Sequence, residues 1–320
     1  MTAVDSRVSD AAAPADQASR LRAAILSLPD RAEALPARAP GAGGPVLAIT
    51  SGKGGVGKTS LAVNLAIALS KLGVRVVLVD ADLGMANADV LCGLNPARRL
   101  ELAIPVGGQR TALTALALNA PGGFRLVPGS TGIARMAAMS GAERDGVLHQ
   151  IDELRADADL VILDTGAGLG PGVLDFVEAA QLALVVATPE PTSIADAYAM
   201  LKCLARRGVT ASRGTRIGLV VNQALDQDEA NRVHGRISSV SQRFLGAGVE
   251  SIGSVRSDPA VAAAVRARVP LLLHAPGARA AGDVRSLSES VSRVLELRPS
   301  EETTGVIRRF LRVFSRPSRG

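Results

Sequence analysis

The sequence reads Ser51-Gly52-Lys53-Gly54-Gly55-Val56-Gly57-Lys58-Thr59-Ser60 between an apolar run, residues 46–49, and a helical pattern, residues 61–72. This order of strand, glycine-rich loop and helix is the context that a phosphate-binding loop requires. The glycines let the backbone turn tightly, so that its N–H groups and the N-terminus of the helix point at phosphate oxygens. We therefore expect this stretch to bind a nucleotide rather than to be a turn without a ligand.

Two side chains of the loop have expected roles of their own. Lys58 would reach the β- and γ-phosphates, and Thr59 would offer its hydroxyl to Mg²⁺. The remaining contacts to the nucleotide are expected from the loop as a whole, that is from Gly52, Lys53, Gly54, Gly55, Val56, Gly57, Lys58, Thr59 and Ser60.

Composition narrows the class of protein. With 320 residues, of which 47% are hydrophobic, the chain can bury one large α/β core and still have tails. Aromatic residues make up only 2%, so Ala, Val, Leu and Ile must fill that core. The same scarcity argues against single-stranded nucleic acid, which binds on aromatic stacking platforms, and we expect no nucleic-acid partner. The net charge of +6 does not by itself choose among nucleic acid, anionic lipid and acidic protein.

Cysteine, histidine and hydropathy patterns point to an intracellular protein. The two cysteines form no disulfide framework, and the three histidines are isolated, with no metal-ligand spacing. No apolar run reaches the ~18–20 residues that a membrane-spanning helix needs. The acidic N-terminus does not look like a signal peptide. We expect a cytoplasmic protein.

The chain divides into a central domain with two tails. Residues 1–45 are rich in Ala, Pro, Ser and Asp, a composition that predicts a flexible arm. Within it we expect a helix at about 16–28, capped by Asp16. The apolar stripe of that helix either folds back on the domain or meets a partner. An ATPase domain is expected over 46–297, a polar linker over 298–304 and a basic tail over 305–320.

Alternating strand and helix patterns predict an α/β fold with a doubly wound, mostly parallel sheet. In such sheets the ligand lies outside the carboxyl ends of the strands, and a polar motif follows each expected strand. The strands are expected at residues 46–49, 74–79, 124–127, 160–163, 182–187 and 217–221.

Four polar residues at these strand ends are candidates for chemistry. Asp164 follows four apolar residues, as a Walker B aspartate does, and would hold Mg²⁺. Of Asp80 and Asp82, one can hold the water shell of the metal while the other orients an attacking water. An aspartate pair after a strand is otherwise ordinary turn chemistry. Asn222, expected at the end of the last strand, could bind an adenine edge or simply start a turn.

The spacing K-G-G-x-G-K-[ST], with Lys53 as its first residue, resembles the deviant Walker A motif of the MinD/ParA family of P-loop ATPases. Over residues 46–297 the resemblance is closest to the flagellar-number regulators called FlhG, FleN or YlxH. MinD proteins tend to have Ser-Pro-Ala-Gly after the Walker B aspartate, whereas this chain has Thr165-Gly166. The other matching stretches are VDADLGMANADV (79–90), DTGAG (164–168) and TPEPTSIADAY (188–198).

The resemblance implies roles for the residues already singled out. Asp82 would orient the catalytic water and Asp80 would support the metal, together with Thr59 and Asp164. Lys53 would reach across a dimer interface to the nucleotide of the other subunit, so that Lys53, Asp82 and Lys58 are the catalytic set. Such a protein dimerises around ATP, returns to monomers on hydrolysis, and regulates flagellar number and placement.

The resemblance also implies a partner for the arm. Its segment Asp16-Gln17-Ala18-Ser19-Arg20-Leu21-Arg22 looks like the activator motif that binds the signal-recognition-type GTPase FlhF and stimulates its GTP hydrolysis. A flagellar transcription factor or C-ring proteins are further partners that the family suggests.

The tail has the pattern of a helix that lies on an anionic membrane. A helical arrangement gathers apolar residues on one side and arginines on the other, which predicts reversible binding to the inner face of the cytoplasmic membrane. Docking on protein is the alternative. The residues concerned are Val306, Ile307, Phe310, Leu311 and Phe314 on the apolar side, and Arg308, Arg309 and Arg312 on the basic side.

Three other functions remain open. The chain could be a MinD- or ParA-like regulator of cell division or DNA segregation, although its clearest arginine cluster lies on the tail. A metabolic P-loop enzyme is disfavoured by the lack of a Cys-x-x-Cys pair and by the arm and tail. A scaffold that binds ATP without turnover is disfavoured because the acidic groups that hydrolysis needs are present.

Overall fold

The computed structural model describes residues 43–82, 85–103, 111–130, 140–209, 214–246 and 248–298. The expected arm helix at 16–28 and the expected basic tail over 305–320 lie outside these residues. Among the described helices, none is both long and apolar enough to cross a membrane.

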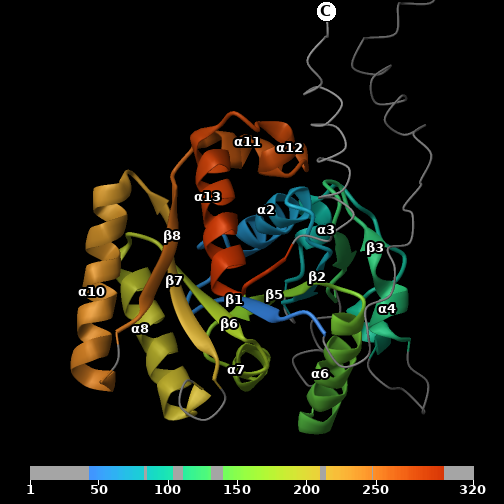
Figure 1. Ribbon diagram of the computed structural model, residues 1–320, viewed down its shortest axis with the longest axis horizontal. Helices are drawn as coiled ribbons and strands as arrows, with labels where there is room; N and C mark the ends of the chain where they lie inside the picture. The colour runs from blue at the N-terminus through green and yellow to red at the C-terminus, as the bar shows by residue number, and fades with distance from the viewer. Residues whose placement is uncertain are drawn as a thin grey trace, which may run out of the picture. The chain divides into compact units, whose positions relative to one another are not determined.

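An eight-stranded sheet forms the centre of the described chain, in the order β3-β4-β2-β5-β1-β6-β7-β8 (Figure 1). Neighbouring strands are parallel except for β3 and β4, which are antiparallel. This confirms the predicted α/β fold with a mostly parallel sheet. The strands are β1 (Val46–Ser51), β2 (Val76–Ala81), β3 (Leu118–Asn119), β4 (Arg125–Val127), β5 (Leu160–Ala167), β6 (Leu182–Ala187), β7 (Arg216–Ala224) and β8 (Glu250–Arg256).

Helices cover both faces of the sheet (Figure 1). One face packs against α2 (Lys58–Lys71), α3 (Ala88–Leu91), α11 (Pro259–Ala267), α12 (Leu271–His274) and α13 (Arg279–Val294). The other packs against η1 (Leu100–Ala103), α4 (Leu113–Leu116), α6 (Gly141–Ala156), α7 (Pro171–Glu178), α8 (Pro191–Arg206) and α10 (Gln227–Leu245).

Alternation along each strand divides the core into two layers. Leu47 and Ile49 of β1 belong to the layer beneath α2 and α13, whereas Val46 and Ala48 belong to the layer beneath α7 and α8. Successive side chains of a strand point to opposite faces, and burial on both faces explains why the central strands read as continuous apolar runs. Both layers consist mainly of Ala, Val, Leu and Ile, as the composition predicts.

All the predicted strands are present, but β3 and β8 were not expected. The two-residue strand β3 is too short to give a pattern. Strand β8 lies at the sheet edge and contains Ser251, Gly253 and Ser254, and only Ile252 and Val255 of it are buried. Because β8 follows β7, the expectation that Asn222 ends the last strand is wrong. Asn222 lies within β7, two residues before its end.

Candidate nucleotide-binding site

The glycine-rich loop has the backbone geometry of an anion cradle. Gly55 and Gly57 have φ angles of 79° and 89°, in the left-handed region that residues with a Cβ rarely adopt. Gly57 is the N-cap of α2, which begins at Lys58 and has no acidic residue in its first turn. The free N–H groups and the positive end of the helix dipole are therefore available to an anion.

Lys58 is buried at the base of this loop, with 7% of its surface exposed. Its Nζ donates a hydrogen bond to Ser51 Oγ at 3.0 Å, and Ser51 Oγ donates in turn to the Lys53 carbonyl at 2.6 Å. Burial lowers the pKa of Lys58, and the carboxylates of Asp164 and Asp82 oppose this change. The ammonium group is thus held between the loop and the acidic residues, where a phosphate would meet it.

Asp164 lies on β5, directly beside Asp80 of the neighbouring strand β2. It is fully buried, and neither carboxylate oxygen has a hydrogen-bond partner among the described residues. Burial and the neighbouring Asp80 raise the pKa of Asp164, while the Thr59 hydroxyl and the Lys58 charge act in the opposite direction. A buried carboxylate without a partner is costly, and oxygen ligands of this kind suit Mg²⁺. Asp164 and Thr59 therefore fit the metal that the phosphate-binding loop implies.

Asp80 has a different environment, because its oxygens accept hydrogen bonds from the backbone. Its Oδ2 accepts from the N–H groups of Asn87 and Ala88, both at 2.9 Å, and its Oδ1 accepts from the N–H of Asp82 at 3.3 Å. Burial raises the pKa of Asp80 to about 6, against the effect of these hydrogen bonds. Gly129 packs so closely that a Cβ there would lie 2.7 Å from the Asp80 carbonyl oxygen. Asp80 thus anchors the segment that carries Asp82, and its contact with metal stays a prediction.

Asp82 reaches the pocket in front of the loop. Its Oδ1 accepts a hydrogen bond from the Met85 N–H at 3.0 Å. The pocket has a volume of about 270 Å³ and is lined by Gly54, Gly55, Gly57, Lys58, Thr59, Ser60, Asp82, Met85, Asn87, Leu91 and Ala167. Within the described ranges, no three His, Cys, Asp or Glu side chains converge as a ready-made metal site.

Lys53 points away from this pocket, toward the start of α8. Its Nζ lies 2.5 Å from Glu190 Oε2 and donates a hydrogen bond to Thr192 Oγ1 at 2.9 Å. Gly52 permits this arrangement, because a Cβ at that position would collide with the Asp196 carbonyl. In the single chain the lysine is therefore held within its own subunit.

Glu190 and Thr192 received no role from the sequence, although both lie in the stretch 188–198 that carries the family resemblance. The sequence could not predict their contact with Lys53, for two reasons. The pairing joins residues more than a hundred positions apart, and an acidic residue before a helix is ordinary capping chemistry.

Asn222 contacts the loop itself. Its Nδ2 donates a hydrogen bond to the Val56 carbonyl at 2.8 Å. The next residue, Gln223, has a φ of 60° at a register shift between β7 and β8, so the strand bulges where it passes the loop. The structure thus gives Asn222 a loop-positioning contact that the sequence did not predict, and contact with adenine stays a prediction.

Comparison with known proteins agrees with this geometry. Residues 47–271 match the model of the CobQ/CobB/MinD/ParA nucleotide binding domain. The antiactivator FleN of Pseudomonas aeruginosa is 38% identical over 247 residues, which are 77% of this chain and 85% of FleN. The flagellum site-determining protein YlxH of Helicobacter pylori is 29% identical over 82% of this chain and 84% of YlxH.

Solved structures support the fold. The crystal structure of the cell division ATPase MinD from Pyrococcus furiosus superposes with a TM-score of 0.65 at 24% identity, covering 78% of this chain and 99% of that one. At this identity the likeness concerns the arrangement of strands and helices.

Replacing Asn222 separates its two roles. If Asn222 positions the loop, Asn222→Ala weakens binding of ADP and of inorganic tripolyphosphate alike, by roughly threefold to tenfold for one lost hydrogen bond. Isothermal titration with both ligands measures this, and Asn231→Ala on the exposed face of α10 is the control. A loss confined to ADP would instead assign Asn222 to the adenine ring.

Proposed function

Because the chain belongs to the CobQ/CobB/MinD/ParA nucleotide-binding family and is a P-loop ATPase that uses ATP and Mg²⁺, we propose that it is a dimerising switch regulating flagellar number and placement. The observation that carries this proposal is the similarity to FleN over most of both chains. The buried Lys58 and Asp164, together with the half-buried Thr59 at the pocket, support turnover rather than binding alone.

The chain's own groups provide position and charge for phosphoryl transfer to water. The loop backbone and Lys58 bind the phosphates, and Thr59 and Asp164 would hold Mg²⁺, which neutralises charge on the phosphate oxygens. Asp82, at the rim of the pocket, orients the attacking water. Asp80 keeps Asp82 in place through its hydrogen bonds to the backbone of residues 82, 87 and 88.

Lys53 makes the switch responsive to dimerisation. Its partner Glu190 is 63% exposed in the side chain, and exposed ion pairs contribute only about 0.2–1 kcal/mol. Losing this pair therefore costs little compared with a contact to the phosphates of a second subunit's nucleotide. ATP binding in two facing subunits releases Lys53 from Glu190, and hydrolysis allows it to return.

Two segments outside the described residues connect the switch to its partners. The arm segment Asp16–Arg22 binds the GTPase FlhF and stimulates it. The tail, residues 305–316, binds an anionic membrane weakly as one copy and more strongly as two copies in the dimer. ATP therefore controls both location and partner contact.

The proposal as a whole is tested in cells. In a flagellated bacterium whose FleN-type regulator has been deleted, expression of this chain restores the normal flagellar count, whereas the Asp82→Ala variant does not. Electron microscopy provides the count, with septum position scored in the same cells. An uncorrected count together with displaced septa would favour the cell-division alternative.

Hydrolysis and dimerisation are separable in vitro. Asp82→Ala retains ATP affinity, turns over on the order of 10²-fold more slowly, and accumulates as a dimer with ATP. Lys53→Ala binds nucleotide as a monomer. Phosphate release and light scattering measure the two properties. An ATP-dependent dimer of Lys53→Ala would remove the lysine from the interface.

The arm acts without the ATPase domain. A peptide of residues 1–35 raises the rate of GTP hydrolysis by FlhF, and Gln17→Ala reduces that stimulation. The same peptide with Ser27→Ala, outside the motif, serves as the matched control. A peptide without effect would mean that the helix at 16–28 packs on its own domain.

The tail is tested by co-sedimentation with anionic vesicles. Pelleting requires both ATP and residues 305–316, decreases as salt rises because each arginine contributes through charge, and is lost in Phe310→Glu. Neutral vesicles provide the control. A protein lacking the tail that pellets equally well would contradict a membrane role.

A further inference from the structure

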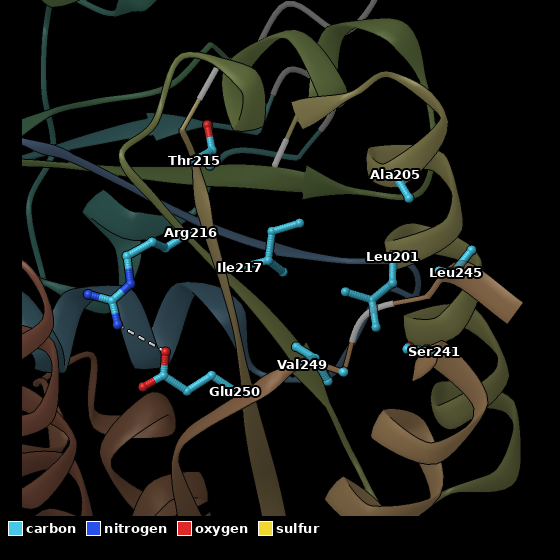
Figure 2. Close-up of a pocket in the computed structure, with 10 residues that line it drawn as sticks. Leu201, Ala205, Thr215, Arg216, Ile217, Ser241, Leu245, Val249 and Glu250 are labelled. Carbon is cyan, nitrogen blue, oxygen red and sulfur yellow. Dashed lines mark hydrogen bonds and ion pairs between the residues drawn. The ribbon is translucent and has the colours of Figure 1, made fainter. Parts of the chain in front are cut away.

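A second pocket, of about 300 Å³, lies at the amino ends of strands β7 and β8 (Figure 2). It opens between α8 and α10 where β7 and β8 begin, at Arg216 and Glu250, whereas the nucleotide loop lies at the carboxyl ends of the strands. We propose that this pocket binds a small uncharged molecule that has an apolar body and one hydroxyl or N–H group.

The walls of the pocket are aliphatic. Figure 2 shows Leu201 from α8 and Leu245 from α10 on one side, with Ile217 of β7 and Val249 before β8 facing them. Lining of this kind favours an apolar ring or short chain, because water released from such surfaces is the main driving force for binding. At about 300 Å³ the pocket is at the lower limit of ligand sites, so a molecule of about two fused rings suits it.

One polar group inside the pocket has no partner. Ser241 on α10 is 2% exposed, and its Oγ has no hydrogen bond among the described residues. Thr215, also in the lining, instead donates to the Ala180 carbonyl at 2.9 Å. Buried hydroxyl groups are nearly always hydrogen-bonded, because leaving one unpaired destabilises the fold. The Ser241 hydroxyl can both donate and accept a hydrogen bond. The single polar group of the ligand, a hydroxyl or an N–H, would donate a hydrogen bond to the Ser241 oxygen.

The charges at the mouth exclude a strongly charged ligand. Arg216 Nη2 and Glu250 Oε2 form an ion pair at 3.0 Å, drawn as a dashed line in Figure 2. Arg216 also donates from Nη1 to the Val294 carbonyl at 3.0 Å. The two charges of the pair compensate one another, so the lining has no net charge to attract an anion or a cation. We therefore expect the ligand of this pocket to be uncharged.

The experiment uses the full chain, saturated with ADP and Mg²⁺, and 2-naphthol as the probe. This molecule has a two-ring apolar body and one hydroxyl, and it is neutral at pH 7. Because the chain contains no tryptophan, naphthol fluorescence can be followed with little background from the protein. We expect saturable binding of one naphthol per chain that ADP does not displace.

Variants of Ser241 place the probe in this pocket. Ser241→Ala weakens naphthol binding about threefold to tenfold, the effect of one lost hydrogen bond. Ser241→Leu fills the cavity and weakens binding by at least about tenfold. Ser239→Ala, on the exposed face of the same helix, binds like the wild type.

Thermal unfolding of the ligand-free protein separates a binding role from a structural one. Because Ser241→Ala removes an unpaired buried hydroxyl, it raises the unfolding midpoint while it weakens binding. A hydroxyl that served only the fold would lower the midpoint on replacement and leave binding unchanged, which would overturn the proposal. Absence of saturable binding, displacement by ADP, or wild-type affinity in Ser241→Ala would overturn it as well.

Discussion

The buried carboxylate of Asp164 is the constraint on which the rest of the site depends. It lies on β5, and the sheet order places β5 between β2, which carries Asp80, and β1, which leads into the phosphate-binding loop. Burying an acidic group is costly, and the neighbouring Lys58 charge and Thr59 hydroxyl offset part of that cost. A nucleotide with its metal would complete this charge arrangement and would thereby stabilise the folded protein.

Around this centre the fold divides tasks between rigid and adaptable contacts. Asp80 accepts hydrogen bonds from three backbone N–H groups and packs against Gly129, which holds the backbone at residues 82, 87 and 88 in place. The contact of Lys53 with Glu190, by contrast, is exposed and its free energy is small. The switch between monomer and dimer that we propose would need such an easily exchanged contact beside a fixed catalytic frame.

Strand β7 contributes to both sites, one at its carboxyl end and one at its amino end. Near its carboxyl end the register shifts, Gln223 adopts a left-handed backbone, and Asn222 holds the loop at Val56. At its start, Arg216 and Ile217 border the second pocket. Helix α8 likewise begins beside Lys53 and has Leu201, in its second half, at that pocket. The two sites thus share β7 and α8, although one lies at the carboxyl ends of the strands and the other at their amino ends.

The sequence by itself determined the loop, the central strands and the identity of the polar residues at their ends. These signals are local: glycine spacing, apolar runs buried on both faces, and a carboxylate, Asp80 or Asp164, directly after two of these runs. What only the tertiary structure decided are the contacts between residues far apart in the sequence, namely Glu190 with Lys53 and Asn222 with Val56, and the short-range hydrogen bond of Asp80 with the backbone of α3. The sequence also did not predict the edge strand β8, because a strand with few buried positions needs few apolar residues and gives a weak pattern. Pairings of this kind depend on which strands become neighbours, and that is fixed by packing of the whole sheet rather than by any short stretch of chain.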